Sequence, residues 1–203
     1  MTSPTPGMFR IALFASGNGT NAERIALYFK DHPQFQIGPV FYNRKQAYVA
    51  QRAENLGIEA IYLPDSRLKE ADTVLNLLKT HGITHIVLAG YLSLIPAYLT
   101  AAYPQRIVNI HPALLPAYGG KGMYGHHVHE AVAAYREKES GITIHLVDEH
   151  YDRGAILFQV RCPLSPGDTP DRIAEKVHAL EYRHFPEVIE QWVLQTLPPF
   201  QSR

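Results

Sequence analysis

Asn109 and His111, two residues apart, are the pair of side chains in this sequence best suited to move a proton. They end an apolar run, residues 106–110, that predicts a β-strand, and side chains two apart on a strand project to the same face. Pro112 follows and stops the hydrogen-bond ladder of the strand. An amide donor beside a titratable ring can stabilise an oxyanion while a proton is transferred. A purely structural histidine at a strand end is the alternative for this pair taken alone.

Asp152 is a third candidate for proton chemistry. It lies in a turn, residues 151–154 (Tyr-Asp-Arg-Gly), between two predicted strands at residues 141–147 and 155–160. A carboxylate in such a turn commonly accepts hydrogen bonds from nearby backbone amides. If the turn folds toward His111, the carboxylate raises the pKa of the imidazole and fixes its orientation.

The glycine-rich segment at residues 16–22 (Ser-Gly-Asn-Gly-Thr-Asn-Ala) follows the first predicted strand and opens a helix, as in a dinucleotide-binding fingerprint. That fingerprint needs an acidic residue after the second strand, where Asn43 and Arg44 stand instead. This disfavours NAD, whereas NADP stays open through the basic residue. A tight strand-to-helix turn without a ligand is the other alternative. We favour a cradle for a single phosphate, built from Gly19, Thr20 and Asn21.

The histidines of the second half of the chain raise the question of a metal site. They are His126, His127, His129, His145 and His150. Imidazole nitrogens bind zinc, but this cluster has no recurring acidic partner and no thiolate. We therefore predict no metal, and interpret the clustered histidines as surface or loop-bonding residues. His145 either orients water in the site or fills the interior of a strand.

Apolar periodicity places these candidates on an alternation of strands and helices. Strands are predicted at residues 9–15, 36–42, 58–63, 85–89, 106–110, 141–147 and 155–160. Helices are predicted after the glycine-rich segment and at residues 46–56, 65–78, 96–103, 128–136 and 169–192. The pair Asp65 and Ser66 is expected to cap the third of these helices. The pattern predicts an open, twisted, mostly parallel α/β sheet covered by helices on both faces, with a Rossmann-like N-terminal half and antiparallel strands in the C-terminal half.

Composition limits the classes of function. The 203 residues include 19 Lys plus Arg and 19 Asp plus Glu, so the formal net charge is zero and no basic field gathers nucleic acid or anionic lipid. No segment approaches the roughly 18 apolar residues that cross a bilayer. Cys162 is the only cysteine, which fits a reducing compartment. We predict a cytoplasmic protein with a disordered leader, residues 1–8, and one domain over residues 9–203.

Seven motifs in order, spanning about residues 9–192, resemble the phosphoribosylglycinamide formyltransferase family, the folate-dependent enzymes of de novo purine synthesis. The motifs are residues 16–21 (SGNGTN), 88–91 (LAGY), 108–116 (VNIHPALLP), 142–145 (ITIH), 147–149 (VDE), 152–154 (DRG) and 181–186 (EYRHFP). The family fold is an open α/β sheet, in agreement with the elements predicted above.

The resemblance implies that the formyl group of 10-formyltetrahydrofolate passes to the amine of phosphoribosylglycinamide. Asn109, His111 and Asp152 match the family's catalytic amide, imidazole and aspartate. The resemblance also implies nucleotide contacts at Gly19, Thr20, Asn21, His178 and Glu181. Implied folate contacts are Arg67, Leu92, Ser93, Leu94, Ile95, Asp148, Glu149, His150 and Tyr151. It implies small-molecule substrates, no metal, and a monomer or weak homodimer.

Three departures from the family pattern affect this transfer of roles. Ser93 stands where many members have arginine, and His178 where a lysine is common. The segment 118–125 is longer and richer in glycine than is usual, and its Lys121 is a further candidate for a phosphate contact. The alternatives within reach of the same residues are a formyltetrahydrofolate hydrolase, a non-catalytic sensor of folate or nucleotide, and an NADP oxidoreductase.

Overall fold

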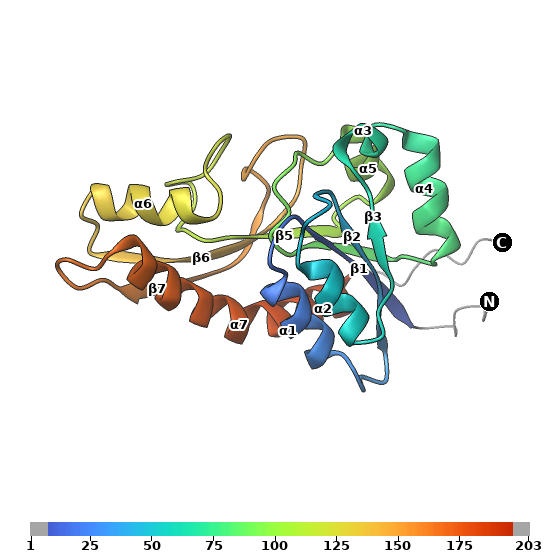
Figure 1. Cartoon of the computed structure of the whole chain (residues 1–203), viewed down its shortest axis with the longest axis horizontal. Coiled ribbons are helices and arrows are strands. Elements are labelled where there is room, and N and C mark those ends of the chain that lie inside the picture. Colours follow the sequence, from blue (N-terminus) through green and yellow to red (C-terminus); the bar gives the residue numbers. More distant parts are fainter. Residues whose placement is uncertain (1–7, 197–203) are drawn as a thin grey trace.

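The computed structural model describes residues 8–196, which build a seven-stranded sheet in the order β3-β2-β1-β4-β5-β6-β7 (Figure 1). The strands are β1 Phe9–Ala15, β2 Phe35–Tyr42, β3 Ala60–Tyr62, β4 His85–Leu88, β5 Ile107–His111, β6 Glu139–Leu146 and β7 Ile156–Pro163. All pairs from β3 to β5 are parallel, whereas β5–β6 and β6–β7 are antiparallel. The predicted mostly parallel sheet with antiparallel strands near its C-terminal end is confirmed. All but the last residue of the predicted leader, 1–8, lies outside the described residues.

Helices cover both faces of the sheet, as predicted. They are α1 Thr20–Tyr28, α2 Val49–Asn55, α3 Asp65–Leu68, α4 Ala71–Thr80, α5 Ala97–Ala102, α6 His126–Ala134 and α7 Pro170–Gln195. Buried side chains of α1, α2, α6 and α7 pack on one face, and those of α3, α4 and α5 on the other. Within the described residues, no helix combines the length and the apolar character needed to cross a membrane.

The position of β1 inside the sheet explains why its sequence is apolar at nearly every residue. Its odd-numbered residues from Phe9 to Ala15 belong to the core under α1 and α7, whereas Ala12 and Phe14 belong to the core under α4 and α5. A parallel strand with helices on both faces has no solvent side, so it carries a continuous apolar run.

One predicted helix is broken in the structure. Residues 65–78 form α3 and then α4 rather than one element, because the backbone of Glu70 is non-helical, with φ −85° and ψ 82°. The Tyr98 hydroxyl donates to the carbonyl oxygen of Leu68, at the end of α3, at 2.7 Å. The predicted cap is also wrong, since Pro64 occupies the N-cap and no side-chain cap bond forms. The Asp65 carboxylate instead accepts hydrogen bonds from Asn43 and Ser93.

The order of the strands creates the crevice that holds the site. From β1 the chain moves outward to β2 and β3, then returns to the other side of β1 to form β4 and β5. The loops after β1 and β4 diverge there, and such a switch point at the carboxyl ends of strands is where ligands bind in open α/β sheets. The two loops are joined by a hydrogen bond of 3.0 Å from the Leu92 backbone N–H to the Ser16 hydroxyl.

Candidate active site

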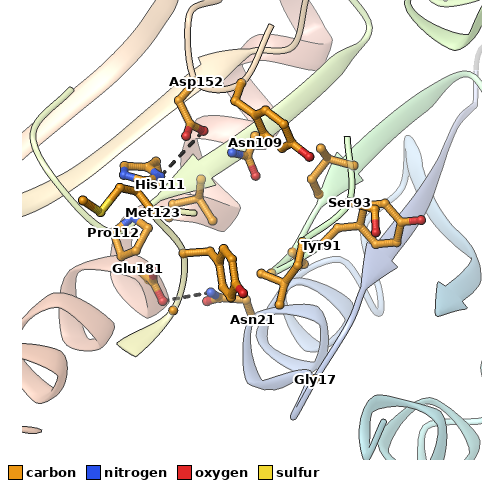
Figure 2. Close-up of a pocket in the computed structure, with 18 of the residues that line it drawn as sticks. Gly17, Asn21, Tyr91, Ser93, Asn109, His111, Pro112, Met123, Asp152 and Glu181 are labelled. Atoms are coloured by element: carbon orange, nitrogen blue, oxygen red, sulfur yellow. Dashed lines mark hydrogen bonds and ion pairs between the residues drawn. The ribbon is translucent and has the colours of Figure 1, made fainter. Parts of the chain in front are cut away.

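A cavity of about 760 Å³ opens at the carboxyl ends of β1, β4 and β5, a size typical of small-molecule sites. Its walls come from the loops after these strands, the glycine-rich segment 120–125, the turn before β7, and the facing sides of α6 and α7. Figure 2 shows side chains from these separate elements pointing toward one space. The cavity therefore gathers residues that are far apart in the sequence.

Asn109, His111 and Asp152 converge on one point of this cavity (Figure 2). The Oδ1 atom of Asp152 lies 3.6 Å from Nδ1 of His111 and 3.5 Å from Nε2 of His145. The side-chain amide of Asn109 lies 3.1 Å from the same nitrogen of His145. The register of β5 against β6 produces this last contact, because it pairs Asn109 directly with His145.

The backbone of the second glycine-rich segment, residues 118–125, holds His111 and Asp152 in place. The Tyr118 carbonyl oxygen lies 2.7 Å from Nε2 of His111, and the Gly120 N–H donates to Oδ2 of Asp152 at 2.9 Å. A carbonyl can only accept, so Nε2 carries the hydrogen in either charge state of His111. The nitrogen that gains or loses a proton is therefore Nδ1, which faces Asp152.

Burial and charge oppose each other in this group. Burial lowers the pKa of His111, and the Asp152 carboxylate and the Tyr118 carbonyl offset this only in part. The Asp152 carboxylate thus raises the pKa of the imidazole, as expected, but burial outweighs this contribution and the net shift is downward. Burial raises the pKa of the Asp152 carboxyl, but the contact with His145, the charge of His111 and the Gly120 N–H together bring the pKa below its usual value. The carboxylate is therefore charged at neutral pH, beside a ring that is uncharged in most molecules.

A sharp turn brings Asp152 to this position. Asp152 has φ 55°, in the left-handed region that aspartate tolerates better than most residues. Two residues on, a Cβ on Gly154 would lie 1.7 Å from the carbonyl oxygen of Leu146. Only glycine lets the turn pack this closely on the end of β6.

The predicted phosphate loop forms the opposite wall. Gly19 caps α1 with φ 78°, and a Cβ there would lie 2.3 Å from Cγ2 of Val49. No side chain caps α1, so the N–H groups of its first turn are available to an anion. The Asn21 amide donates to Oε2 of Glu181 at 2.9 Å, the lower dashed line of Figure 2. Burial raises the pKa of Glu181 to about 7 despite this hydrogen bond.

Most of the residues implied as folate contacts line the cavity, but three do not. Leu92, Ser93, Leu94, Ile95, His150 and Tyr151 are in its wall, and Arg67, Asp148 and Glu149 are not. The Ser93 hydroxyl donates to Oδ1 of Asp65 at 2.8 Å and accepts from the Asn43 amide at 2.9 Å. This side of the cavity thus presents a serine held by an acidic side chain, and no arginine among the lining residues that the structure describes.

Several residues that line the cavity have no role predicted from the sequence. Among them are Asn18, Tyr91, Met123, His129 and Tyr182, while His178 and Lys121 line the cavity as suggested. His129 is only 2% exposed, so its interpretation as a surface histidine is wrong. The signal was present, because Val128 and Val132 mark the buried face of α6 and His129 falls on it. Within residues 8–196, no group of three or more His, Cys, Asp or Glu is arranged to hold a metal ion.

Known proteins match this chain over the strands and helices described above. A family model described as formyl transferase matches residues 9–189. The phosphoribosylglycinamide formyltransferase of Bacillus subtilis (strain 168) is 36% identical over 189 residues, which cover 91% of this chain and 94% of that protein. The chloroplastic phosphoribosylglycinamide formyltransferase of Arabidopsis thaliana is 38% identical over 194 residues, or 93% of this chain. The chain spans 66% of the length of that plant relative.

A solved structure gives the same result for the fold. The crystal structure of phosphoribosylglycinamide formyltransferase from Streptococcus pneumoniae TIGR4 matches with a TM-score of 0.81 at 37% sequence identity. The match covers 92% of this chain and 99% of that one. The likeness therefore includes the strands and helices that surround the cavity.

Proposed function

The chain belongs to the formyl transferase family, among the phosphoribosylglycinamide formyltransferases, and we propose that it transfers the formyl group of 10-formyltetrahydrofolate to the amine of phosphoribosylglycinamide. The observation that carries the proposal is the meeting of Asn109, His111 and Asp152 in one cavity with a helix N-terminus that suits a phosphate. A binding protein would need the phosphate cradle but no such proton-transfer group.

The chemistry follows from the atoms that face one another. As the amine attacks the formyl carbon, a C–N bond forms and negative charge develops on the formyl oxygen. The Asn109 amide has two N–H groups, of which one is directed at His145, so the second remains for this oxyanion. Protonated His111 supplies a second donor at Nδ1, and the facing Asp152 carboxylate stabilises the imidazolium. The carbon–nitrogen bond to folate then breaks, and the proton lost by the amine is returned to the departing folate nitrogen.

The walls of the cavity divide the two substrates between them. The first turn of α1 receives the phosphate, and Glu181, held by Asn21, accepts from ribose hydroxyls. The slot from Leu92 to Ile95, with its backbone polar groups, suits the flat pterin ring of the folate. His150 and Tyr151 line the same cavity from the turn that carries Asp152.

We also propose the domain organisation, the compartment and the oligomeric state of the enzyme. Residues 9–203 act as one domain, in the cytoplasm, as a monomer or weak homodimer. The single sheet with helices on both faces supports one domain, and the single cysteine supports a reducing compartment.

The test is a formyl-transfer assay with purified protein, 10-formyl-5,8-dideazafolate and phosphoribosylglycinamide. We expect turnover that requires the nucleotide and falls on the order of 100-fold or more in His111→Ala, because a proton-transfer group contributes about 10²–10⁴ in rate. His127→Ala, an exposed histidine on α6, is the matched control and keeps full activity.

Each other outcome indicates a different function or mechanism for this protein. Release of the deformylated folate without the nucleotide indicates a hydrolase. Binding of both ligands with no reaction indicates a sensor, and equal activity of the two variants removes His111 from the reaction.

A further inference from the structure

His129 is a buried polar side chain that neither the fold nor the proposed reaction has yet explained. It projects from the first turns of α6 into the wall of the cavity and is 2% exposed. Its Nδ1 atom is buried and finds no hydrogen-bond partner among the residues that the structure describes. A buried nitrogen without a partner destabilises a folded protein, so its partner is expected to come from a molecule in the cavity.

Packing alone does not call for a histidine at this position. Its neighbours on the buried face of α6 are Val128 and Val132, both part of the core beneath α7. An apolar side chain of similar size would fill the same space without leaving a polar atom unpaired.

The surroundings of His129 place it between the two ends of the proposed nucleotide site. Its ring packs edge-on against His178 of α7, with the ring centres 6.0 Å apart. Burial first, and then the nearby charges of His178, His126 and His111, lower the pKa of His129 to about 4. At neutral pH the ring is therefore uncharged, with one donor and one acceptor nitrogen.

The polar groups of the proposed substrate leave one without a protein partner. The amine belongs beside Asn109 and His111, the ribose hydroxyls beside Glu181, and the phosphate at the start of α1. The carboxamide lies between the amine and the ribose, is uncharged, and has both a donor and an acceptor. Resting on the proposed function, we propose that His129 binds the carboxamide of phosphoribosylglycinamide and so holds the amine at the reaction centre.

The test uses His129→Phe, which keeps a ring of similar shape and removes both nitrogens, with His127→Phe on the exposed side of α6 as the control. We expect the KM for phosphoribosylglycinamide to rise about tenfold, the size of one lost hydrogen bond, and the KM for the folate to stay unchanged. We expect the Tm of the free variant to equal or exceed that of the original chain, because an unpaired buried nitrogen is removed. His129→Asn, whose amide lies close to the position of Nδ1, restores most of the lost affinity.

A ligand that lacks the carboxamide locates the contact. Ribose 5-phosphate carries the sugar and phosphate alone, and its inhibition constant stays within about twofold between the original chain and His129→Phe, well below the tenfold effect of one hydrogen bond. An equal loss of affinity for ribose 5-phosphate places the contact on the sugar or phosphate and overturns the proposal. A lower Tm with an unchanged KM shows a structural role and also overturns it. Absence of nucleotide-dependent turnover in the original chain refutes the proposed function itself, a result that the variants cannot imitate.

Discussion

At the scale of single residues, the site depends on which atoms of a side chain are already engaged. His111 uses Nε2 for the Tyr118 carbonyl, which leaves Nδ1 to exchange a proton. Asn109 uses one N–H toward His145 and keeps the other. In each side chain one polar atom or N–H group is thus held by the protein, and the other remains available for the reaction. This reduces the reorganisation needed during the reaction.

Glu181 gives a prediction about pH and stability. The folded-state pKa of this carboxyl is raised to about 7 by burial, so between pH 4.5 and 7 the unfolded chain loses a proton that the folded chain keeps. The free energy of unfolding therefore falls as pH rises through this window. In urea titrations, Glu181→Gln should gain about 2 kcal/mol relative to the original chain between pH 5 and pH 8. Glu187→Gln, at an exposed position of the same helix, is the control, and an unchanged difference at the two pH values contradicts the prediction.

The sequence predicts the residues of the site better than their contacts. The spacing of Asn109 and His111 on a strand end is a local property, so it could be predicted. The approach of Asp152 depends on a turn about forty residues away in the chain and is visible only in the fold. Arg67, a folate contact that the resemblance implies outside the seven motifs, is not among the residues that line the cavity.

At the scale of elements, the turn between β6 and β7 decides whether the site is complete. A Cβ on Gly154 would collide with the Leu146 carbonyl, a backbone atom that cannot swing aside, so Gly154→Ala must displace the turn. We expect the free energy of unfolding to fall by about 1–3 kcal/mol. We expect kcat to fall more than about tenfold, because a shift of about 1 Å in a catalytic group can cost up to 10²-fold.

The neighbouring exposed residue provides the control for that experiment. Arg153→Ala changes the same turn without adding an atom near β6, and should keep both stability and kcat. A Gly154→Ala variant with normal kcat would show that the turn can move without carrying Asp152 away from His111.

Element boundaries were predictable where the pattern is local and failed where a distant residue intervenes. The strands and the long α7 follow directly from apolar periodicity. The break between α3 and α4 lies at Glu70, inside a helical spacing of apolar residues, and the end of α3 there contacts the hydroxyl of Tyr98, thirty residues downstream of Leu68, which no local pattern contains.

At the scale of the whole molecule, His85 ties the end of α7 to the sheet. Its ring is fully buried between Phe9 and Trp192 and lies within hydrogen-bond distance of the Thr84 and Thr196 hydroxyls. Burial, together with the charge of Arg106, lowers its pKa to about 3, so below pH 6.5 the unfolded chain gains a proton that the folded chain does not. The free energy of unfolding therefore falls as pH falls from 6.5 toward 3.

His85→Gln removes this proton uptake. The variant should be less stable at pH 7, where it loses ring packing, but its deficit relative to the original chain should shrink by about 2 kcal/mol between pH 7 and pH 5. Urea titrations at the two pH values measure this change, with the exposed His150→Gln as control. A constant deficit contradicts the prediction.

The backbone contacts of residues 118–125 limit how the sequence of this site can change in evolution. The Tyr118 carbonyl and the Gly120 N–H belong to every amino acid that can adopt the local conformation, except that proline lacks the N–H. Side chains can therefore drift between lineages at positions such as Lys121 and Met123, whereas Gly120, at φ 96°, is restricted by its own backbone conformation, and the reaction centre keeps its support. Aligned sequences will show variability here that conceals a strict requirement on the path of the chain, and replacement of the Gly120 amide by an ester is the change that would expose it.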